Sequence, residues 1–328
     1  MAIDLGNYLT ENFTRSEQLS RSENTATEEN LPREENLSRE EHFSHLAKKH
    51  PCFSGEAHMK FGRMHLPVSP ACNIQCNFCV RSLNQTEERP GVTQKILSPD
   101  EAVDTVEKAL GLCPEITVVG IAGPGDTLAS SASLDTFGKV HERFPEMILC
   151  LSTNGLRLEE NVERMVDVGV QTISVTVNAV DPDILSQLVG WVAWHGKSYS
   201  GPQGAEILIQ AQLRGIRKAA ASGLLVKCNA VLVPSINDDH IEEIAKAVSE
   251  AGAASLNIIP LIPQGKLSHI PAPSCAALNR ARLTAERYLP VFRHCKHCRA
   301  DACGIPGKNI ELSALLYSKQ VENTFSHG

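Results

Sequence analysis

The sequence predicts an α/β fold, a partial (β/α)6 barrel of TIM-like architecture. Two observations lead to this prediction. Short, nearly continuous apolar runs rich in β-branched residues alternate with longer segments of helical periodicity, the pattern of buried parallel strands joined by helices. The chain also has 328 residues, 42% of them hydrophobic, which is enough to bury one large core. Because connections between parallel strands are right-handed, the sheet is expected to curl.

The expected strand–helix units follow one another along the middle of the chain. The first helix has the clearest start, because Ser98 suits an N-cap, Pro99 the first helical position and Glu101 the end of a capping box. The other elements are assigned from apolar runs and helical periodicity. Strands are expected over 66–71, 115–122, 147–154, 170–179, 224–233 and 254–262, and helices over 98–112, 133–143, 158–168, 203–222, 238–251 and 276–289.

The first 47 residues differ in composition from the rest. They hold ten acidic and four basic residues and few apolar ones, so most of the formal net charge of −7 lies there. Such a segment cannot bury enough surface to offset the entropy of ordering it. We therefore expect an acidic, disordered or loosely helical extension over 1–47, a cysteine- and histidine-containing segment over 48–65, the barrel over 66–290, and a C-terminal segment with a second cysteine cluster and tail over 291–328.

The charge and hydropathy of the chain limit the classes of partner and the cellular compartment that we expect for it. A net charge of −7 and a pI near 6.0 do not favour nucleic acid or an anionic membrane as partner. No apolar run has the length of a membrane span. The N-terminal MAIDLGNYLTENF lacks the basic and apolar regions of a secretory signal. The expectation is a cytoplasmic protein with no nucleic acid and no membrane partner.

Three of the eleven cysteines lie together in CNIQCNFC, directly after the first expected strand: Cys72, Cys76 and Cys79. In a reducing compartment this spacing favours a metal site over disulfides. Three thiolates can bind three irons of a 4Fe–4S cluster. The fourth iron is then open to the amino and carboxylate groups of S-adenosylmethionine (SAM), which an electron from the cluster cleaves to a 5′-deoxyadenosyl radical. The alternative is a zinc loop, which usually needs four protein ligands in paired spacing.

Further candidate SAM contacts follow other expected strands, whose carboxyl ends open on one face of a barrel. The turn GIAGPGD contains Gly123 and Gly125, which allow a ligand close to the backbone, and Asp126, which can pair with an amine. Thr176 and Asn178 lie near the end of the fourth strand and could contact the ribose or carboxylate. That these two are only polar caps of a strand end is an equally good interpretation.

The triad resembles the radical SAM superfamily signature, with Phe78 in the aromatic position that approaches the adenine. Eight segments occur in order between His50 and Gly304: HPCFSGEAHMKFGRMHLPVSPACNIQCNFC, ERPGV, GIAGPGD, LCLSTNG, VNAVDP, VLVPSIND, NIIPLI and RHCKHCRADA. Together they resemble the NifB family, whose members build the core of the nitrogenase cofactor. Four cysteines have no assigned role in this resemblance. Cys303 stands where relatives commonly have an apolar residue and is either an extra ligand or a substitution of no consequence, Cys228, in mid-strand, is expected to pack in the core, and Cys113 and Cys275 lie in loops next to prolines.

The resemblance implies a partial barrel of the radical SAM type and a lyase-type cofactor maturase. It implies three 4Fe–4S clusters, one binding SAM and two serving as substrate. The two substrate clusters would be fused, with a carbide from the SAM methyl group and one added sulfide, into an 8Fe-9S-C precursor of the iron–molybdenum cofactor. The implied partners are iron–sulfur cluster donors and nitrogenase cofactor assembly or carrier proteins. Many relatives have a C-terminal carrier domain, and this chain is expected to lack one, since it ends at Gly328.

The resemblance also implies ligands for the substrate clusters. By residue type alone, a lone strand cysteine is more often a core residue and a lone histidine a structural donor. HCKHC is different, because two thiols flanked by basic residues favour thiolates and metal, with zinc as the competitor. The resemblance assigns Cys52, His65 and Cys150 to the first substrate cluster, Cys295 and Cys298 to the second, and places Glu87 near both.

Two other hypotheses remain at this point. A non-catalytic iron–sulfur scaffold or carrier would store and pass on clusters, yet it has no need for an open iron beside SAM. A radical SAM enzyme acting on an organic substrate would need the triad, yet it would not require Cys52, His65 and the HCKHC segment.

Overall fold

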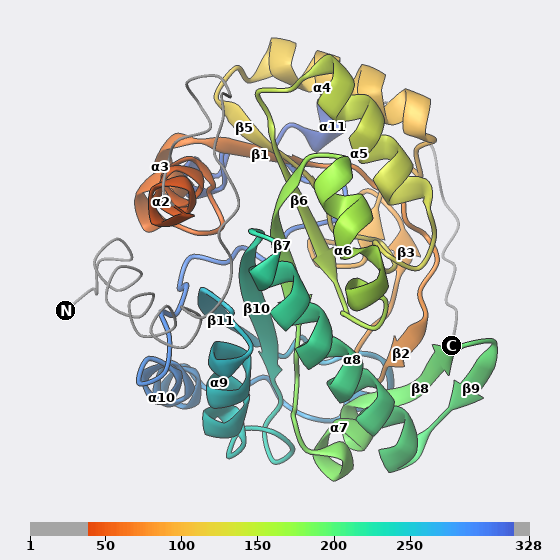
Figure 1. Cartoon of the computed structure of the whole chain (residues 1–328), viewed down its shortest axis with the longest axis vertical. Coiled ribbons are helices and arrows are strands. Elements are labelled where there is room, and N and C mark those ends of the chain that lie inside the picture. Colours follow the sequence, from red (N-terminus) through yellow and green to blue (C-terminus); the bar gives the residue numbers. More distant parts are fainter. Residues whose placement is uncertain (1–38, 318–328) are drawn as a thin grey trace, which may run out of the picture.

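A computed structural model describes residues 39–317, and its centre is a seven-stranded sheet. The strand order is β11-β10-β7-β6-β5-β1-β12 (Figure 1). All neighbouring pairs are parallel except the last, in which β12 runs antiparallel to β1. The strands are β1 (Gly62–His65), β5 (Ile116–Ile121), β6 (Ile148–Thr153), β7 (Val170–Thr176), β10 (Leu225–Leu232), β11 (Ser255–Pro260) and β12 (Cys303–Gly304).

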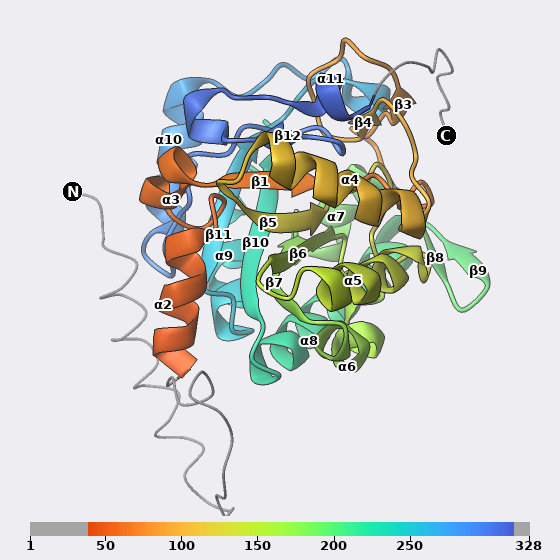
Figure 2. The same ribbon diagram turned by 90° about the horizontal axis from the view of Figure 1, so that it is seen from above.

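Helices connect the parallel strands and lie along one side of the curled sheet (Figures 1 and 2). The capping box predicted for the first of them is present: the Ser98 hydroxyl accepts from the Glu101 amide, and the Glu101 carboxylate accepts from the Ser98 amide. The predicted α/β class and partial barrel are confirmed. The covering helices are α4 (Pro99–Leu112), α5 (Ala132–Arg143), α6 (Leu158–Asp167), α8 (Gly201–Ala221), α9 (Ile241–Glu250) and α10 (Cys275–Ala285).

The two faces of the sheet differ in their surroundings. Successive side chains of a strand point to opposite faces. On β6, Leu149 and Leu151 are buried in the core formed with the helices, whereas Cys150 and Ser152 line a cavity on the other face. The same alternation continues on β7, β10 and β11. The sheet therefore has one apolar face toward its helices and one more polar, concave face toward the cavity.

Two predicted boundaries were wrong. The first strand is β1, four residues before the expected 66–71, where Pro67 and Pro70 have no amide hydrogen for a ladder. Residues 39–47 do not belong to a disordered extension, because α2 (Arg39–Lys49) buries Phe43 and Leu46 in a small apolar cluster that continues onto the sheet. The remainder of the expected extension lies outside the described residues.

Several elements were not predicted. The cysteine loop forms β2 (Ile74–Cys76), which pairs with β8 (Val189–Trp194) of a hairpin completed by β9 (Lys197–Tyr199). Figure 2 shows this hairpin projecting at one end of the molecule. The others are short: α3 (Gly55–Lys60), β3 (Ser82–Leu83), β4 (Val92–Thr93), α7 (Pro182–Leu188), η1 (Gly265–Leu267), η2 (Pro306–Lys308) and α11 (Ser313–Leu316).

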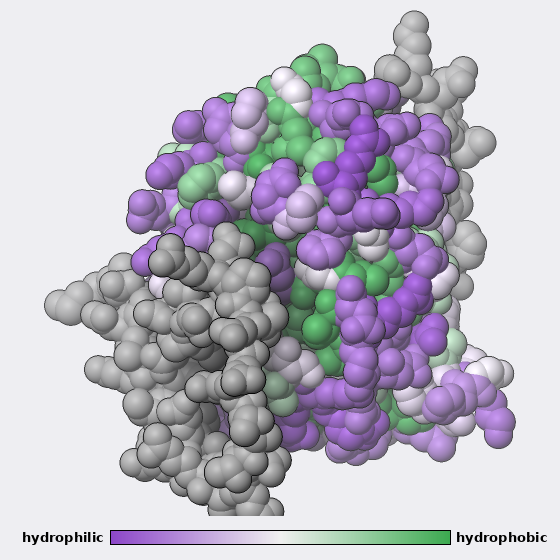
Figure 3. Space-filling model, turned by 45° about the horizontal axis from the view of Figure 1, so that its top comes forward, coloured by the Kyte–Doolittle hydropathy of each residue, from purple (hydrophilic) through white to green (hydrophobic). Residues whose placement is uncertain are grey.

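The surface in Figure 3 is mainly hydrophilic, with apolar side chains showing at the centre of the view and along its upper edge. The exposed large apolar side chains belong to separate elements, for example Leu112 at the end of α4 and Leu283 on α10. Within residues 39–317, every helix is too short or too polar to cross a lipid bilayer.

Candidate active site

A cavity of about 370 Å³ lies against the concave face of the sheet. This is within the usual size of a small-molecule or cofactor site. Its wall takes side chains from all six parallel strands and from the cysteine loop. It also takes Cys52 from the segment before β1 and Cys295, His297 and Cys298 from the segment before β12. Segments distant in sequence therefore meet around one space.

The three cysteines of the loop, Cys72, Cys76 and Cys79, are unpaired, partly buried, and line this cavity. Backbone bonds hold the loop from two sides. On one side, the amides of Gly125 and Asp126 donate to the carbonyls of Ser69 (2.6 Å) and Ala71 (2.8 Å). On the other side, β2 pairs with β8, a support that the sequence did not reveal. The loop is thus fixed before any ligand binds.

The donor set of this loop fits a 4Fe–4S cluster. Within residues 39–317, no three His, Cys, Asp or Glu side chains converge to hold one metal ion. A 4Fe–4S cluster does not require three cysteines to converge on one metal ion, because each cysteine binds a different iron. Burial and the nearby Asp126 raise the pKa of Cys72 to about 11, and burial also raises the pKa values of Cys76 and Cys79. The thiols are therefore protonated at neutral pH, and cluster binding must release their protons.

The predicted SAM contacts are mostly on the cavity wall, and the structure shows what else they do. The buried Asp126 carboxylate accepts from the amides of Asn154 (2.6 Å) and Leu128 (3.0 Å) and from the Thr153 hydroxyl. It therefore ties the GPGD turn to the end of β6, and its pairing with an amine stays a prediction. Phe78, Gly125, Asp126, Thr176 and Asn178 line the cavity, and Gly123 does not.

A second group of cysteines and one histidine lines the same cavity. Cys52, Cys150 and Cys298 all belong to this group, although they come from three distant segments of the chain. Burial raises the pKa of Cys52 to about 12, which Lys227 opposes, and it raises the pKa of Cys150 as well. The structure brings together all five cysteine and histidine ligands expected for the substrate clusters: Cys52, His65, Cys150, Cys295 and Cys298.

His65 is held in one tautomer. Its Nδ1 lies 3.1 Å from the carbonyl oxygen of Arg299, which can only accept, so Nδ1 carries the proton and Nε2 keeps its lone pair. His65 is paired with Gly120 in the sheet, and Gly120 with Cys150 on the next strand. Because glycine has no side chain, the His65 ring can lie close to Gly120, where an added Cβ would come 3.1 Å from its Cδ2.

Comparison with known proteins identifies the chain. The Radical SAM superfamily model matches residues 66–248. The FeMo cofactor biosynthesis protein NifB of Methanocaldococcus infernus is 46% identical over 282 residues, which cover 85% of this chain and 93% of that relative. The protein of that name from Methanocaldococcus jannaschii is 47% identical over 80% of this chain and 88% of its own. The chain belongs to the NifB family. It is a radical SAM enzyme, and this membership implies a 4Fe–4S cluster and SAM.

Solved structures support the fold of this NifB-family chain. The crystal structure of SuiB from Streptococcus suis has a TM-score of 0.51 with it and 14% sequence identity, over 87% of this chain and 59% of that one. At this identity the likeness concerns the fold alone.

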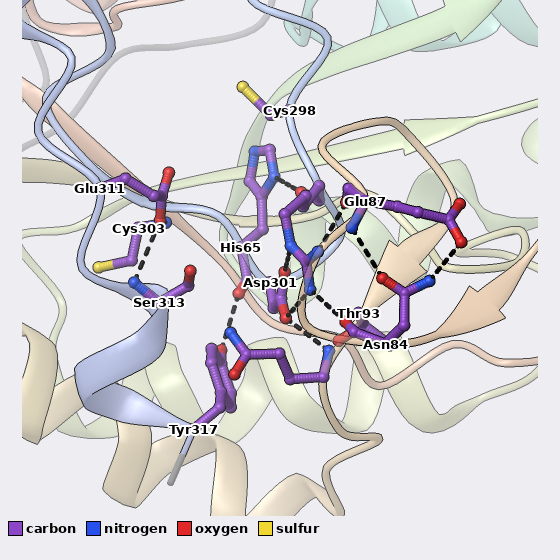
Figure 4. A network of polar contacts seen from close by, with 12 residues as sticks. His65, Asn84, Glu87, Thr93, Cys298, Asp301, Cys303, Glu311, Ser313 and Tyr317 are labelled. Carbon is purple, nitrogen blue, oxygen red and sulfur yellow. Dashed lines mark hydrogen bonds and ion pairs between the residues drawn. The ribbon is translucent and has the colours of Figure 1, made fainter. Parts of the chain in front are cut away.

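Glu87, shown next to Asn84 in Figure 4, is the one ligand candidate of this NifB-family chain that does not line the cavity. Its exposed carboxylate accepts from the Asn84 amide (2.8 Å) and pairs with Arg89. Arg299 holds the loop that carries Glu87 in place. Its guanidinium donates to the carbonyls of Glu87 (2.7 Å) and Asn84 (2.8 Å). The C-terminal cysteine segment therefore positions this loop.

Cys303 and Cys228 are buried in the core and do not line the cavity, so packing is their role in this structure. Other cavity residues were missed by sequence reasoning. Lys227 had a signal, a charge inside the apolar run LLVKCNAVLV. Asn154 also had one, because it lies in the segment LCLSTNG at the end of the third expected strand. Arg63, Gln212 and Asn257 were not singled out, because only the fold brings them to the cavity.

Proposed function

We propose that this chain builds the core of the nitrogenase iron–molybdenum cofactor. In this proposal it fuses two 4Fe–4S substrates, with a carbide from a SAM methyl group and one added sulfide, into an 8Fe-9S-C precursor. The observation that carries the proposal is that one cavity is lined both by the cysteine triad and by a separate set of cysteines and a histidine. Relatives almost half identical to this chain carry the name FeMo cofactor biosynthesis protein.

In this proposal the triad holds the resident cluster beside SAM. That cluster supplies the electron that cleaves one SAM, while a second SAM supplies the methyl group. Two buried acceptors of the cavity, Gln212 Oε1 and Asn257 Oδ1, have no hydrogen-bond partner among the described residues and suit donor groups of SAM. The proposed SAM contacts are Phe78, Gly123, Gly125, Asp126, Thr176 and Asn178.

The second set of residues would hold the two substrate clusters. A substrate must be bound and later released, and few protein ligands with a harder nitrogen or oxygen donor among them favour exchange. His65 suits the role of a nitrogen ligand, because its Nδ1 makes the hydrogen bond to the Arg299 carbonyl and its Nε2 lone pair stays available. We assign Cys52, His65 and Cys150 to one substrate cluster, Cys295 and Cys298 to the other, and Glu87 to a place near them.

The test is iron analysis with product analysis under anaerobic conditions. Purified protein should bind about twelve irons if three 4Fe–4S clusters are present. With SAM and a reductant it should form 5′-deoxyadenosine and S-adenosylhomocysteine together. Replacing Cys72, Cys76 and Cys79 by alanine should remove about four irons and all SAM cleavage, and leave the other clusters visible by EPR.

Three results would contradict the proposal in different ways. Formation of 5′-deoxyadenosine without S-adenosylhomocysteine would exclude methyl transfer. Full iron loading without SAM cleavage would favour the scaffold. Only about four irons, all lost with the triad, would favour an organic substrate. Partners among cluster donors and cofactor assembly or carrier proteins follow from the same proposal, and co-purification from nitrogen-fixing cells would find them.

A further inference from the structure

Lys227 brings a positive charge into the cavity. It lies on β10, its side chain is only 5% exposed, and it lines the cavity wall. Its Nζ donates to the carbonyl of Cys52 (3.0 Å) and lies 4.9 Å and 5.3 Å from the ring centres of Phe53 and Phe292. The ammonium group is therefore held beside the Cys52 segment by one hydrogen bond and two aromatic faces.

This charge has no counterion in the part of the chain that the structure describes. Of the ion pairs among residues 39–317, none involves Lys227. The groups that its Nζ does contact are neutral: the Cys52 carbonyl and the rings of Phe53 and Phe292. A buried charge without a counterion is costly in free energy. If Lys227 had only a structural role, an apolar side chain would cost less free energy at this position. The buried charge therefore indicates that an anion binds beside it.

Arg63 adds a second buried cation on the same wall. Its guanidinium is 3% exposed and donates to the Gly304 carbonyl (3.1 Å) and to the Cys298 sulfur (3.2 Å). Glu311 pairs with it only at 3.6 Å and from a partly exposed position. The Nε atom of Arg63 has no partner among the described residues. Both cations thus lie next to the cysteines of the second set.

We infer that Lys227 and Arg63 bind the two anionic iron–sulfur substrates, Lys227 the one held by Cys52 and Arg63 the one held by Cys298. This inference rests on the proposed function, which makes those cysteines substrate ligands. An iron–sulfur cluster with thiolate ligands has a net negative charge, which two fixed cations match. Cluster binding would then neutralise the Lys227 charge, which has no counterion among residues 39–317.

The test replaces Lys227 by methionine, which keeps an unbranched side chain one heavy atom shorter and removes the charge, and by arginine, which keeps the charge. Protein loaded anaerobically with iron and sulfide is analysed for iron beyond the triad and for the midpoint potential of that additional iron by EPR. We expect Lys227→Met to weaken the binding of the additional clusters about tenfold, the usual effect of losing a charged partner. Their potential should become more negative, since a buried cation favours the reduced cluster. Lys227→Arg should retain most of both properties.

A packing control separates charge from structure. Phe53→Leu removes one ring beside Nζ and leaves every charge in place. It should leave the potential of the additional clusters near that of the wild type. Iron-free Lys227→Met should have an unfolding midpoint in urea equal to or above the wild type, because the variant no longer buries an unpaired charge.

The inference is overturned if Lys227→Met binds the additional clusters with unchanged affinity and potential. It is also overturned if Phe53→Leu shifts the potential as far as Lys227→Met, or if iron-free Lys227→Met is less stable than the wild type. Wild-type protein that never binds iron beyond the triad would instead overturn the proposed function itself, and with it the inference. A matched pair at the second cation, Arg63→Met and Arg63→Lys, should show the same contrast at the cluster near Cys298.

Discussion

Arg299 and Asp301 form an ion pair whose side chains are 2% and 0% exposed, one and three residues beyond the last cavity cysteine, Cys298. Figure 4 shows Asp301 in this network. The Arg299 Nε lies 2.8 Å from Asp301 Oδ1, and Asp301 Oδ2 also accepts from the amide of Gln94 (2.6 Å). With the two carbonyl bonds to Asn84 and Glu87, this pair joins the C-terminal cysteine segment to the loop over 84–94. The ion pair therefore connects two segments that form the wall of the cavity.

Asp301→Asn should therefore be strongly destabilising. The change leaves the buried Arg299 without its counterion, and breaking one side of a buried pair costs about 3–5 kcal/mol. Urea unfolding measures the loss. Asp135→Asn is the control, since it breaks the half-exposed pair with Arg164 between α5 and α6 and should cost about 1 kcal/mol or less. Equal effects of the two variants would show that Arg299 does not need Asp301.

Gly125→Ala should displace the cysteine triad. A Cβ at Gly125 would lie 2.0 Å from the Ala71 carbonyl oxygen, in the backbone directly before Cys72, so the loop must move. We expect a destabilisation of roughly 1–3 kcal/mol, as for other overpacked sites. The iron held by the triad should fall together with the rate of SAM cleavage.

Gly111→Ala is the control for that variant. Gly111 lies in α4 with no atom within 4 Å of its added Cβ, so alanine should stabilise the protein by roughly 0.5–1 kcal/mol. It should also leave triad iron unchanged. Normal iron binding by Gly125→Ala would show that the cysteine loop tolerates movement away from the GPGD turn.

Local patterns predicted the parts of this fold that depend on neighbours in sequence. The capping box of α4 and five of the six expected strands depend on a few adjacent residues, and they were found, whereas the first expected strand, 66–71, was wrong. In the structure Cys150 faces the cavity and Cys228 faces the helices, a difference that residue type alone did not predict. The pairing of β2 with β8 could not be found this way, because it joins the cysteine loop to a hairpin more than a hundred residues later.

The site shows the same division. The triad was predicted from its spacing alone, whereas His65 and Cys52 needed the family resemblance. The ion pair of Arg299 acts on residues more than two hundred positions away, and nothing in the local sequence marks it. Lys227 was detectable as a charge in an apolar strand, and it was overlooked because strand prediction weighs hydrophobicity and not its exceptions.

The iron-free protein should lose stability as the pH falls from about 6.5 toward 5. Burial, with Lys227 adding to it, lowers the pKa of His50 well below its usual range, and burial with Arg63 lowers the pKa of His65 to about 4. Both remain neutral in the folded protein while the unfolded chain binds protons below pH 6.5. Protons therefore favour the unfolded state in this window, by at most about 1.4 kcal/mol per pH unit for each histidine.

Urea unfolding at several pH values checks this expectation. His65→Asn keeps a donor for the Arg299 carbonyl and removes the titrating ring, so the pH dependence of its unfolding free energy should be shallower than that of the wild type. An identical slope for both proteins between pH 5 and about 6.5 would mean that His65 does not stay neutral in the fold.

Gly120→Ala should act on the substrate clusters and not on the triad. An added Cβ would lie 3.1 Å from His65 Cδ2 and 3.5 Å from the Cys150 carbonyl oxygen, closing the space between these two proposed ligands. The imidazole must then turn away or the cluster must bind elsewhere. Iron beyond the triad should fall while triad iron and its EPR signal persist. Gly138→Ala on α5, whose added Cβ comes no nearer than 3.7 Å to Val168, should change neither. Equal loss of both kinds of iron in Gly120→Ala would mean that the strand itself is disturbed, and the space beside His65 would then have no separate role.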